Sequence, residues 1–96
     1  MKEAINNIIK LVADEFGITP EALRGATRAE SIVIPRMTAM ELVWKHCGVT
    51  YNTVAHHFGK RDHGTVLHAR KRVYALLETN TAFANAYRNI ESSLNL

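Results

Sequence analysis

The chain has 96 residues, 47% of them hydrophobic and 22% charged, which is enough for one core and excludes both a two-domain enzyme and a disordered chain. Its single cysteine, Cys47, predicts a reducing, cytoplasmic setting, and no apolar run approaches the roughly 18 residues of a membrane span. The formal net charge of +3 is only a weak indication of an acidic partner.

Helical periodicity dominates the N-terminal third of the chain. Apolar residues recur at helical spacing over residues 5–16, and Gly17 is typical of a helix C-terminus. Thr19-Pro20 combines an N-cap with proline at the first helical position, which predicts a short helix through about Leu23. Residues 26–34 are expected to form a connecting arm.

Four further helices are expected in the rest of the chain. Their predicted boundaries are Pro35 to Gly48, Thr50 to Gly59, a long helix capped by Asp62 and a last helix capped by Thr81. The β-branched run at residues 32–34 is strand-like, but it is too short to build a sheet. The sequence therefore predicts one all-α domain over residues 1–96, a compact fold of about six helices.

The positive charge is concentrated in one short segment. Residues 60–72 have a net charge of +4, whereas the rest of the chain has a net charge of −1. A local concentration of this kind is what binding to a polyanion requires.

This basic segment lies in a predicted helix-turn-helix at about residues 50–79. A short helix, a tight turn at Gly59-Lys60-Arg61 and a longer basic helix match that motif. On a helical wheel, one side of the longer helix is apolar, and the opposite side carries Gly64, His68 and Lys71, with Arg72 at its margin. Near its start, Asp62, His63 and Thr65 offer groups that can read base edges, while Lys60, Arg61, Lys71 and Arg72 can contact phosphates.

The segment from Phe58 to Ala69 reads FGKRDHGTVLHA. It resembles the signature F-G-G-R-D-H-T-T-V-L-H-A of the C-terminal DNA-binding domain (domain IV) of the bacterial replication initiator DnaA, and the resemblance extends over nearly the whole chain. It implies a Trp-repressor-like helical domain that binds DnaA boxes in double-stranded DNA, in replication initiation or its regulation.

The resemblance also implies roles for single residues. Arg28 would enter the minor groove, Asp62, His63 and Thr65 would touch base edges, and Arg36 and Arg61 would hold phosphates. With the wheel and the charges added, the candidate base contacts are Arg28, Asp62, His63, Gly64 and Thr65. The candidate phosphate contacts are Arg36, Lys60, Arg61, His68, Lys71 and Arg72.

The sequence departs from the family pattern at three places. Gly64 stands where the family usually has threonine, Met37 replaces a common polar residue, and Tyr51-Asn52 replaces a frequent Leu-Pro. We expect Gly64→Thr to raise stability and to sharpen the preference for a DnaA box. The phosphate-binding loop G-x-x-x-x-G-K-[S/T] of the initiator's ATPase module does not occur in the chain.

Some residues have an alternative, purely structural interpretation. Asp62 is explained equally by helix capping and by a base contact, and both can hold. The histidine pairs have poor spacing for a shared metal, and Cys47 is better explained as core filling than as a nucleophile.

The expected function is therefore non-enzymatic, sequence-preferring binding of double-stranded DNA, with replication initiation proteins as further partners. No cofactor, metal, nucleotide or membrane is expected, and the expected location is cytoplasmic, at the nucleoid. The alternative is a protein-interaction module of the same fold that regulates an initiator without binding DNA specifically.

Overall fold

The computed structural model describes residues 2–59 and 62–94, and over these ranges the secondary structure is helical with no strand. In chain order the elements are α1 (Lys2–Phe16), α2 (Pro20–Arg24), α3 (Glu30–Cys47), α4 (Tyr51–His57), α5 (His63–Thr79) and α6 (Thr81–Leu94). The all-α fold class expected from the sequence is confirmed.

Local side-chain caps explain where three of the helices begin. The side chains of Thr19, Thr50 and Asp62 each accept a hydrogen bond from the backbone N–H three residues later, at 3.1, 3.2 and 2.9 Å. These bonds satisfy amides that have no partner inside the helix. At the far end of α3, Gly48 has a φ of +64°, the left-handed conformation that stops a helix. These caps and this stop were predicted from the sequence and are confirmed.

The predicted start of α3 at Pro35 is wrong. The helix begins at Glu30, so Pro35 lies inside it and the strand-like residues 32–34 are helical. Proline cannot donate to the carbonyl of Ser31, one turn earlier, but Ser31 is exposed, so water can satisfy that carbonyl. Burial of Pro35 and packing of Ile34 against the core favour helix over the local preferences of this run.

The predicted cap of α6 is also wrong by one residue. The side chain of Asn80, which precedes α6, accepts from the backbone N–H of Phe83 at 2.9 Å, whereas Thr81 is the first residue of the helix. Asn80 has extended backbone angles and so has the geometry of an N-cap.

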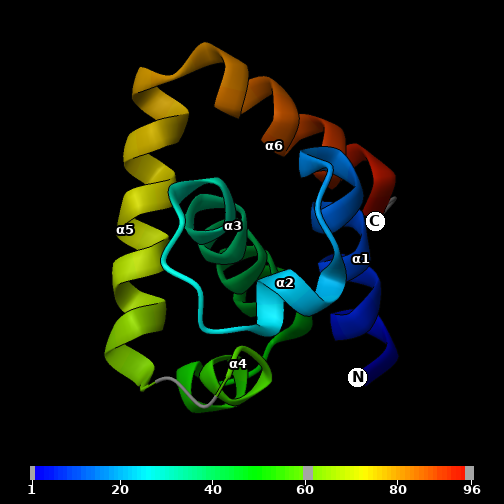
Figure 1. Cartoon of the computed structure of the whole chain (residues 1–96), viewed down its shortest axis with the longest axis vertical. Helices are drawn as coiled ribbons and strands as arrows, with labels where there is room; N and C mark the ends of the chain where they lie inside the picture. Colours follow the sequence, from blue (N-terminus) through cyan, green and yellow to red (C-terminus); the bar gives the residue numbers. More distant parts are fainter. Residues whose placement is uncertain (1, 60–61, 95–96) are drawn as a thin grey trace.

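Helix α3 lies at the centre of the molecule (Figure 1). It packs against α5 on one side and against α1 on the other, and it also contacts α2 and α4. Helix α6 packs against both α1 and α5. The largest fully buried side chains of this core are Ile5, Ile9, Leu23, Met40, Leu42, Phe58 and Ile90. The structure thus holds α4 and α5 against the central helix α3, with one side of α5 left to solvent.

Candidate nucleic-acid interface

Helices α4 and α5 form the predicted helix-turn-helix. Phe58, directly after α4, is fully buried, and Gly59 turns the chain with a φ of +86°. A positive φ strongly favours glycine, so the turn is built into the sequence at this position. The predicted phosphate contacts Lys60 and Arg61 lie outside the described residues.

The first turn of α5 is held by Asp62. Its Oδ1 accepts from the backbone N–H of Thr65 at 2.9 Å and from the Thr65 hydroxyl at 3.1 Å. These two bonds lower the pKa of the Asp62 carboxyl, which is therefore ionised at neutral pH. Asp62 is thus an N-cap. Because the Thr65 hydroxyl donates its hydrogen bond to Asp62, Thr65 has its methyl group and the two lone pairs of its oxygen left for other contacts.

The side of α5 assigned to DNA is open to solvent. Val66, Ala69 and Val73 are fully buried, as the wheel predicted. The exposed candidate residues on the helix are His63, Gly64, His68, Lys71 and Arg72, and Thr65 is half-buried.

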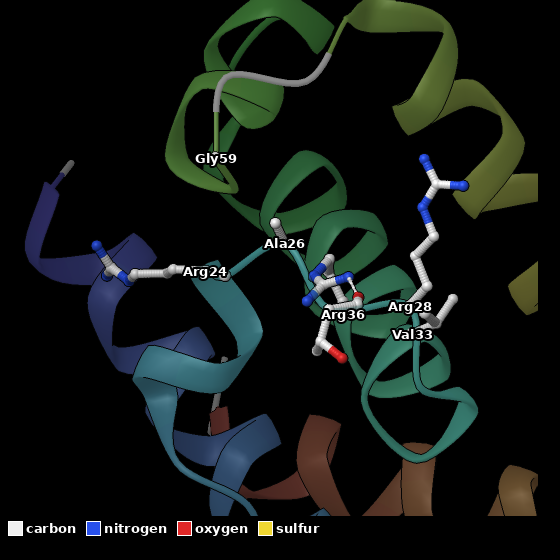
Figure 2. A pocket seen from close by; sticks show the side chains of 8 residues that line it. Arg24, Ala26, Arg28, Val33, Arg36 and Gly59 are labelled. Atoms are coloured by element: carbon white, nitrogen blue, oxygen red, sulfur yellow. Dashed lines mark hydrogen bonds between the residues drawn. The ribbon is translucent and has the colours of Figure 1, made fainter.

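A second candidate element is the arm between α2 and α3, residues 25–29. Arg28 is exposed on this arm. Figure 2 shows that its side chain extends toward the side where α5 runs, whereas Arg24 points the other way. Together with Gly59 and Val33, these residues line a surface hollow of about 660 Å³. The arm and Gly59, the described residue of the turn, therefore lie side by side.

Arg36, predicted to hold a phosphate, lies underneath this arm instead. Its side chain is only 4% exposed. Nε donates to the carbonyl of Leu23 at 2.8 Å, Nη1 to that of Thr27 at 2.8 Å and Nη2 to that of Ala22 at 3.1 Å. The guanidinium therefore ties α3 to the end of α2 and to the residue before Arg28.

The sequence contained an unused signal for this burial. Arg36, Met40, Val43 and Cys47 follow one another at helical spacing, so Arg36 lies on the apolar stripe of α3. A guanidinium that is buried on such a stripe needs hydrogen-bond acceptors, and here three backbone carbonyls supply them.

Two charged side chains at the interface, Glu30 and Arg70, were not predicted from the sequence to be site residues. Glu30, in the first turn of α3, lies 3.8 Å from Arg72 of α5, and both are largely exposed. Arg70, the remaining cation of the basic segment, is half-buried and packs on Trp44. Neither pairing has a signature in the linear sequence, because each joins elements about 26 to 42 residues apart.

Other classes of site have little support in the part of the chain that the structure describes. No three His, Cys, Asp or Glu side chains gather there as a metal site would require. Cys47 is buried, and burial raises the pKa of its thiol. None of the described helices is long and apolar enough to cross a membrane.

Comparison with known proteins agrees with this geometry. The family model described as the bacterial DnaA protein helix-turn-helix matches residues 5–73. The chain is 37% identical to the chromosomal replication initiator protein DnaA of Thermus thermophilus over 90% of its own length and 20% of that protein. It is 34% identical to that of Bdellovibrio bacteriovorus over 95% of its own length and 19% of that protein.

The matched region includes α4, the turn and the basic first half of α5, together with the arm and α3. The chain spans about a fifth of the length of the curated relatives it matches. It belongs to the family of bacterial DnaA helix-turn-helix domains.

Proposed function

We propose that the chain binds double-stranded DNA with a preference for particular sequences, through α5 and the arm that precedes α3. The observation that carries this proposal is the position of the arm beside the helix-turn-helix. Arg28 and Gly59 line one hollow, and Glu30 reaches Arg72. A duplex lying along the exposed side of α5 would therefore meet the arm as well.

The groups on this surface divide into two kinds. His63, Thr65 and Asp62 stand at the start of α5, where side chains of a recognition helix reach base edges in the major groove. Gly64 keeps the helix close to the base pairs at that point, since it has no side chain. Arg28 is proposed to enter the adjacent minor groove.

The remaining cations are proposed to contact phosphates. These are His68, Lys71 and Arg72 on the exposed side of α5, with Lys60 and Arg61 in the turn. The log of the affinity falls as the log of the salt concentration rises, and each phosphate contact makes this slope steeper by about 0.9. Arg36 is proposed to shape the arm from below.

The biological setting follows from the relatives. They are named chromosomal replication initiator proteins, so we place this DNA binding in replication initiation or in its regulation, at the nucleoid. We propose that this chain binds DNA without catalysing a reaction, because the family model it matches is a helix-turn-helix. The chain also contains no loop of the G-x-x-x-x-G-K-[S/T] type that would hold the phosphates of a nucleotide.

Fluorescence anisotropy titrations test the proposal. A labelled DnaA-box duplex and a scrambled duplex of equal length and composition are titrated with the chain at two salt concentrations. We expect tighter binding to the box, with an affinity for both that falls with salt. Equal affinity for the two duplexes would contradict sequence preference, and binding to neither would favour the protein-interaction alternative.

Two substitutions separate base reading from phosphate binding. His63→Ala is expected to reduce the preference for the box by about five- to a hundredfold, the range of one good base contact. Lys71→Ala is the matched control on the exposed side of α5. It is expected to weaken binding to both duplexes equally and to reduce the salt slope of that binding by about 0.9. Equal losses on both duplexes for His63→Ala would contradict its role as a base contact.

A further inference from the structure

Among the described cations Arg70, Lys71 and Arg72 of the basic segment, Arg70 alone is half-buried against other helices, whereas Lys71 and Arg72 are exposed. Its guanidinium carbon lies 3.7 Å from the centre of the Trp44 ring, in the arrangement of a cation–π contact. The rings of Tyr74 and Tyr51 follow at 5.5 and 5.9 Å. We call these four residues, Trp44, Tyr51, Arg70 and Tyr74, the Arg70 cluster.

Hydrogen bonds fix the orientation of the guanidinium inside this cluster. Nη1 donates to the Tyr51 hydroxyl and Nη2 donates to the Tyr74 hydroxyl at 3.3 Å. Tyr74 in turn donates to Oε2 of Glu41 at 3.4 Å, and Glu41 is fully buried. The cation is thus linked through the Tyr74 hydroxyl to the Glu41 side chain inside the core.

The cluster joins the three helices that set the geometry of the DNA-facing surface. Trp44 and Glu41 belong to α3, Tyr51 is the first residue of α4, and Arg70 and Tyr74 belong to α5. The face of the planar guanidinium stacks on the Trp44 ring, and its edge donates hydrogen bonds to the hydroxyls of Tyr51 and Tyr74. Both kinds of contact together restrict the distance and the rotation between these helices. Arg70 also lies directly before Lys71 and Arg72, the proposed phosphate contacts.

We propose that Arg70 is a positioning residue that fixes the orientation of α5 relative to α4 and α3, and that it contacts no phosphate. The inference rests on the proposed DNA binding. Tyr51 and Trp44 act with it, and Tyr51 stands where the family pattern commonly has leucine, so this chain has a polar clamp at a position where leucine offers only apolar contact.

The experiment compares Arg70→Gln and Arg70→Lys with Lys71→Gln in the titrations described above. Arg70→Lys keeps the charge but loses the planar stacking and the fork of donors. We expect both Arg70 variants to lose about tenfold in affinity for the DnaA box, comparable to one lost base contact. Affinity for the scrambled duplex and the salt slope are expected to stay at their wild-type values.

Lys71→Gln gives the opposite pattern, with equal losses on both duplexes and a salt slope reduced by about 0.9. If Arg70→Gln shows that pattern and Arg70→Lys restores binding, Arg70 is a phosphate contact and the inference is wrong. Unchanged box affinity in both Arg70 variants would overturn it as well.

Two further measurements separate positioning from loss of folding. Urea unfolding shows the conditions under which each variant is fully folded, and the titrations are compared there. Tyr51→Phe, which keeps the ring and removes only the hydroxyl that accepts from Arg70, is expected to reduce box preference in the same direction.

Trp44 is the single tryptophan of the chain, so its fluorescence reports on the stacked guanidinium directly. We expect altered emission in both Arg70 variants, and emission identical to wild type would contradict the contact. Absence of box preference in the wild-type chain would instead overturn the proposed function, whatever the emission shows.

Discussion

The Arg36 guanidinium donates to the carbonyl oxygen of Thr27 at 2.8 Å, and Thr27 directly precedes Arg28. A cation in the core thereby holds the backbone that carries the exposed cation of the arm. From the sequence, Arg36 was predicted to contact a phosphate. A substitution distinguishes the two roles, because losing a phosphate contact reduces the salt slope of DNA binding, whereas losing a structural cation lowers the free energy of unfolding.

Arg36→Gln is expected to lower the free energy of unfolding by about 3 kcal/mol, because it removes charged hydrogen bonds, one of them buried and two partly buried, to backbone carbonyls. Urea unfolding measures this loss. Box affinity under fully folding conditions is expected to fall with the salt slope unchanged. A smaller salt slope with normal stability would instead support the direct phosphate contact.

Substitutions at Gly64 act on the cap of α5. Alanine has the higher helix propensity, by up to about 1 kcal/mol, but a Cβ at residue 64 would lie 3.3 Å from Oδ1 of Asp62. The carboxylate must therefore shift, so we expect Gly64→Ala to gain less than the full amount in urea unfolding. Gly64→Thr is expected to sharpen box preference in the titrations. A net loss of stability in Gly64→Ala would show that the cap cannot adjust.

The buried carboxylate of Glu41 depends on Tyr87. The Tyr87 hydroxyl donates to its Oε1 at 2.6 Å, and both side chains are buried. Burial, together with this bond, raises the pKa of Tyr87 far above its ordinary value, so the hydroxyl remains a donor. Tyr87→Phe is expected to cost about 1–3 kcal/mol in urea unfolding, since the carboxylate loses a bond that nothing replaces. Tyr74→Phe, whose bond to Glu41 is 3.4 Å long, is the control and is expected to cost less.

Stability is expected to fall as the pH is lowered through the titration of His57. Burial, then the nearby charges of Arg24, His56 and Lys2, lowers the pKa of His57 below its ordinary 6.5. The unfolded chain therefore takes up the proton first, and stability declines below pH 6.5 until the pH passes the lower folded pKa. Urea unfolding of His57→Gln across this range is expected to show a weaker decline. An identical pH profile would place the proton uptake at another group.

Glu30 is expected to weaken DNA binding through Arg72. Their exposed contact at 3.8 Å is worth at most about 1 kcal/mol, so Glu30→Gln should tighten binding to both duplexes by no more than about fivefold. In the Arg72→Gln background the gain is expected to disappear. A gain of equal size in that background would mean that Glu30 repels the DNA directly.

The features predicted correctly from sequence are those decided within one turn of chain. The capping bonds of Thr19, Thr50 and Asp62 each span three residues, and the apolar spacing of α1 and α5 determines which side is buried. Such local preferences are readable without knowing what else packs nearby.

The features missed are those decided by tertiary contact. Pro35 has a strong local preference for the first turn of a helix, yet burial against the core places it in the second turn of α3. From the sequence, Arg36 was predicted to contact a phosphate and Arg70 was counted only as part of the basic segment. In the structure, both side chains bind residues of other helices. Their role therefore depends on distances that no local pattern contains.

The burial of Arg36 has a consequence for how DNA approaches the molecule. An arginine keeps its proton even when buried, so its field extends beyond the arm over roughly the 8 Å screening length of physiological salt. A charge enclosed in this way makes no direct ion pair with a phosphate, yet its screened field still attracts a polyanion. It therefore adds to the rate at which DNA and protein meet, while the direct contacts of the final complex are made by the side chains outside.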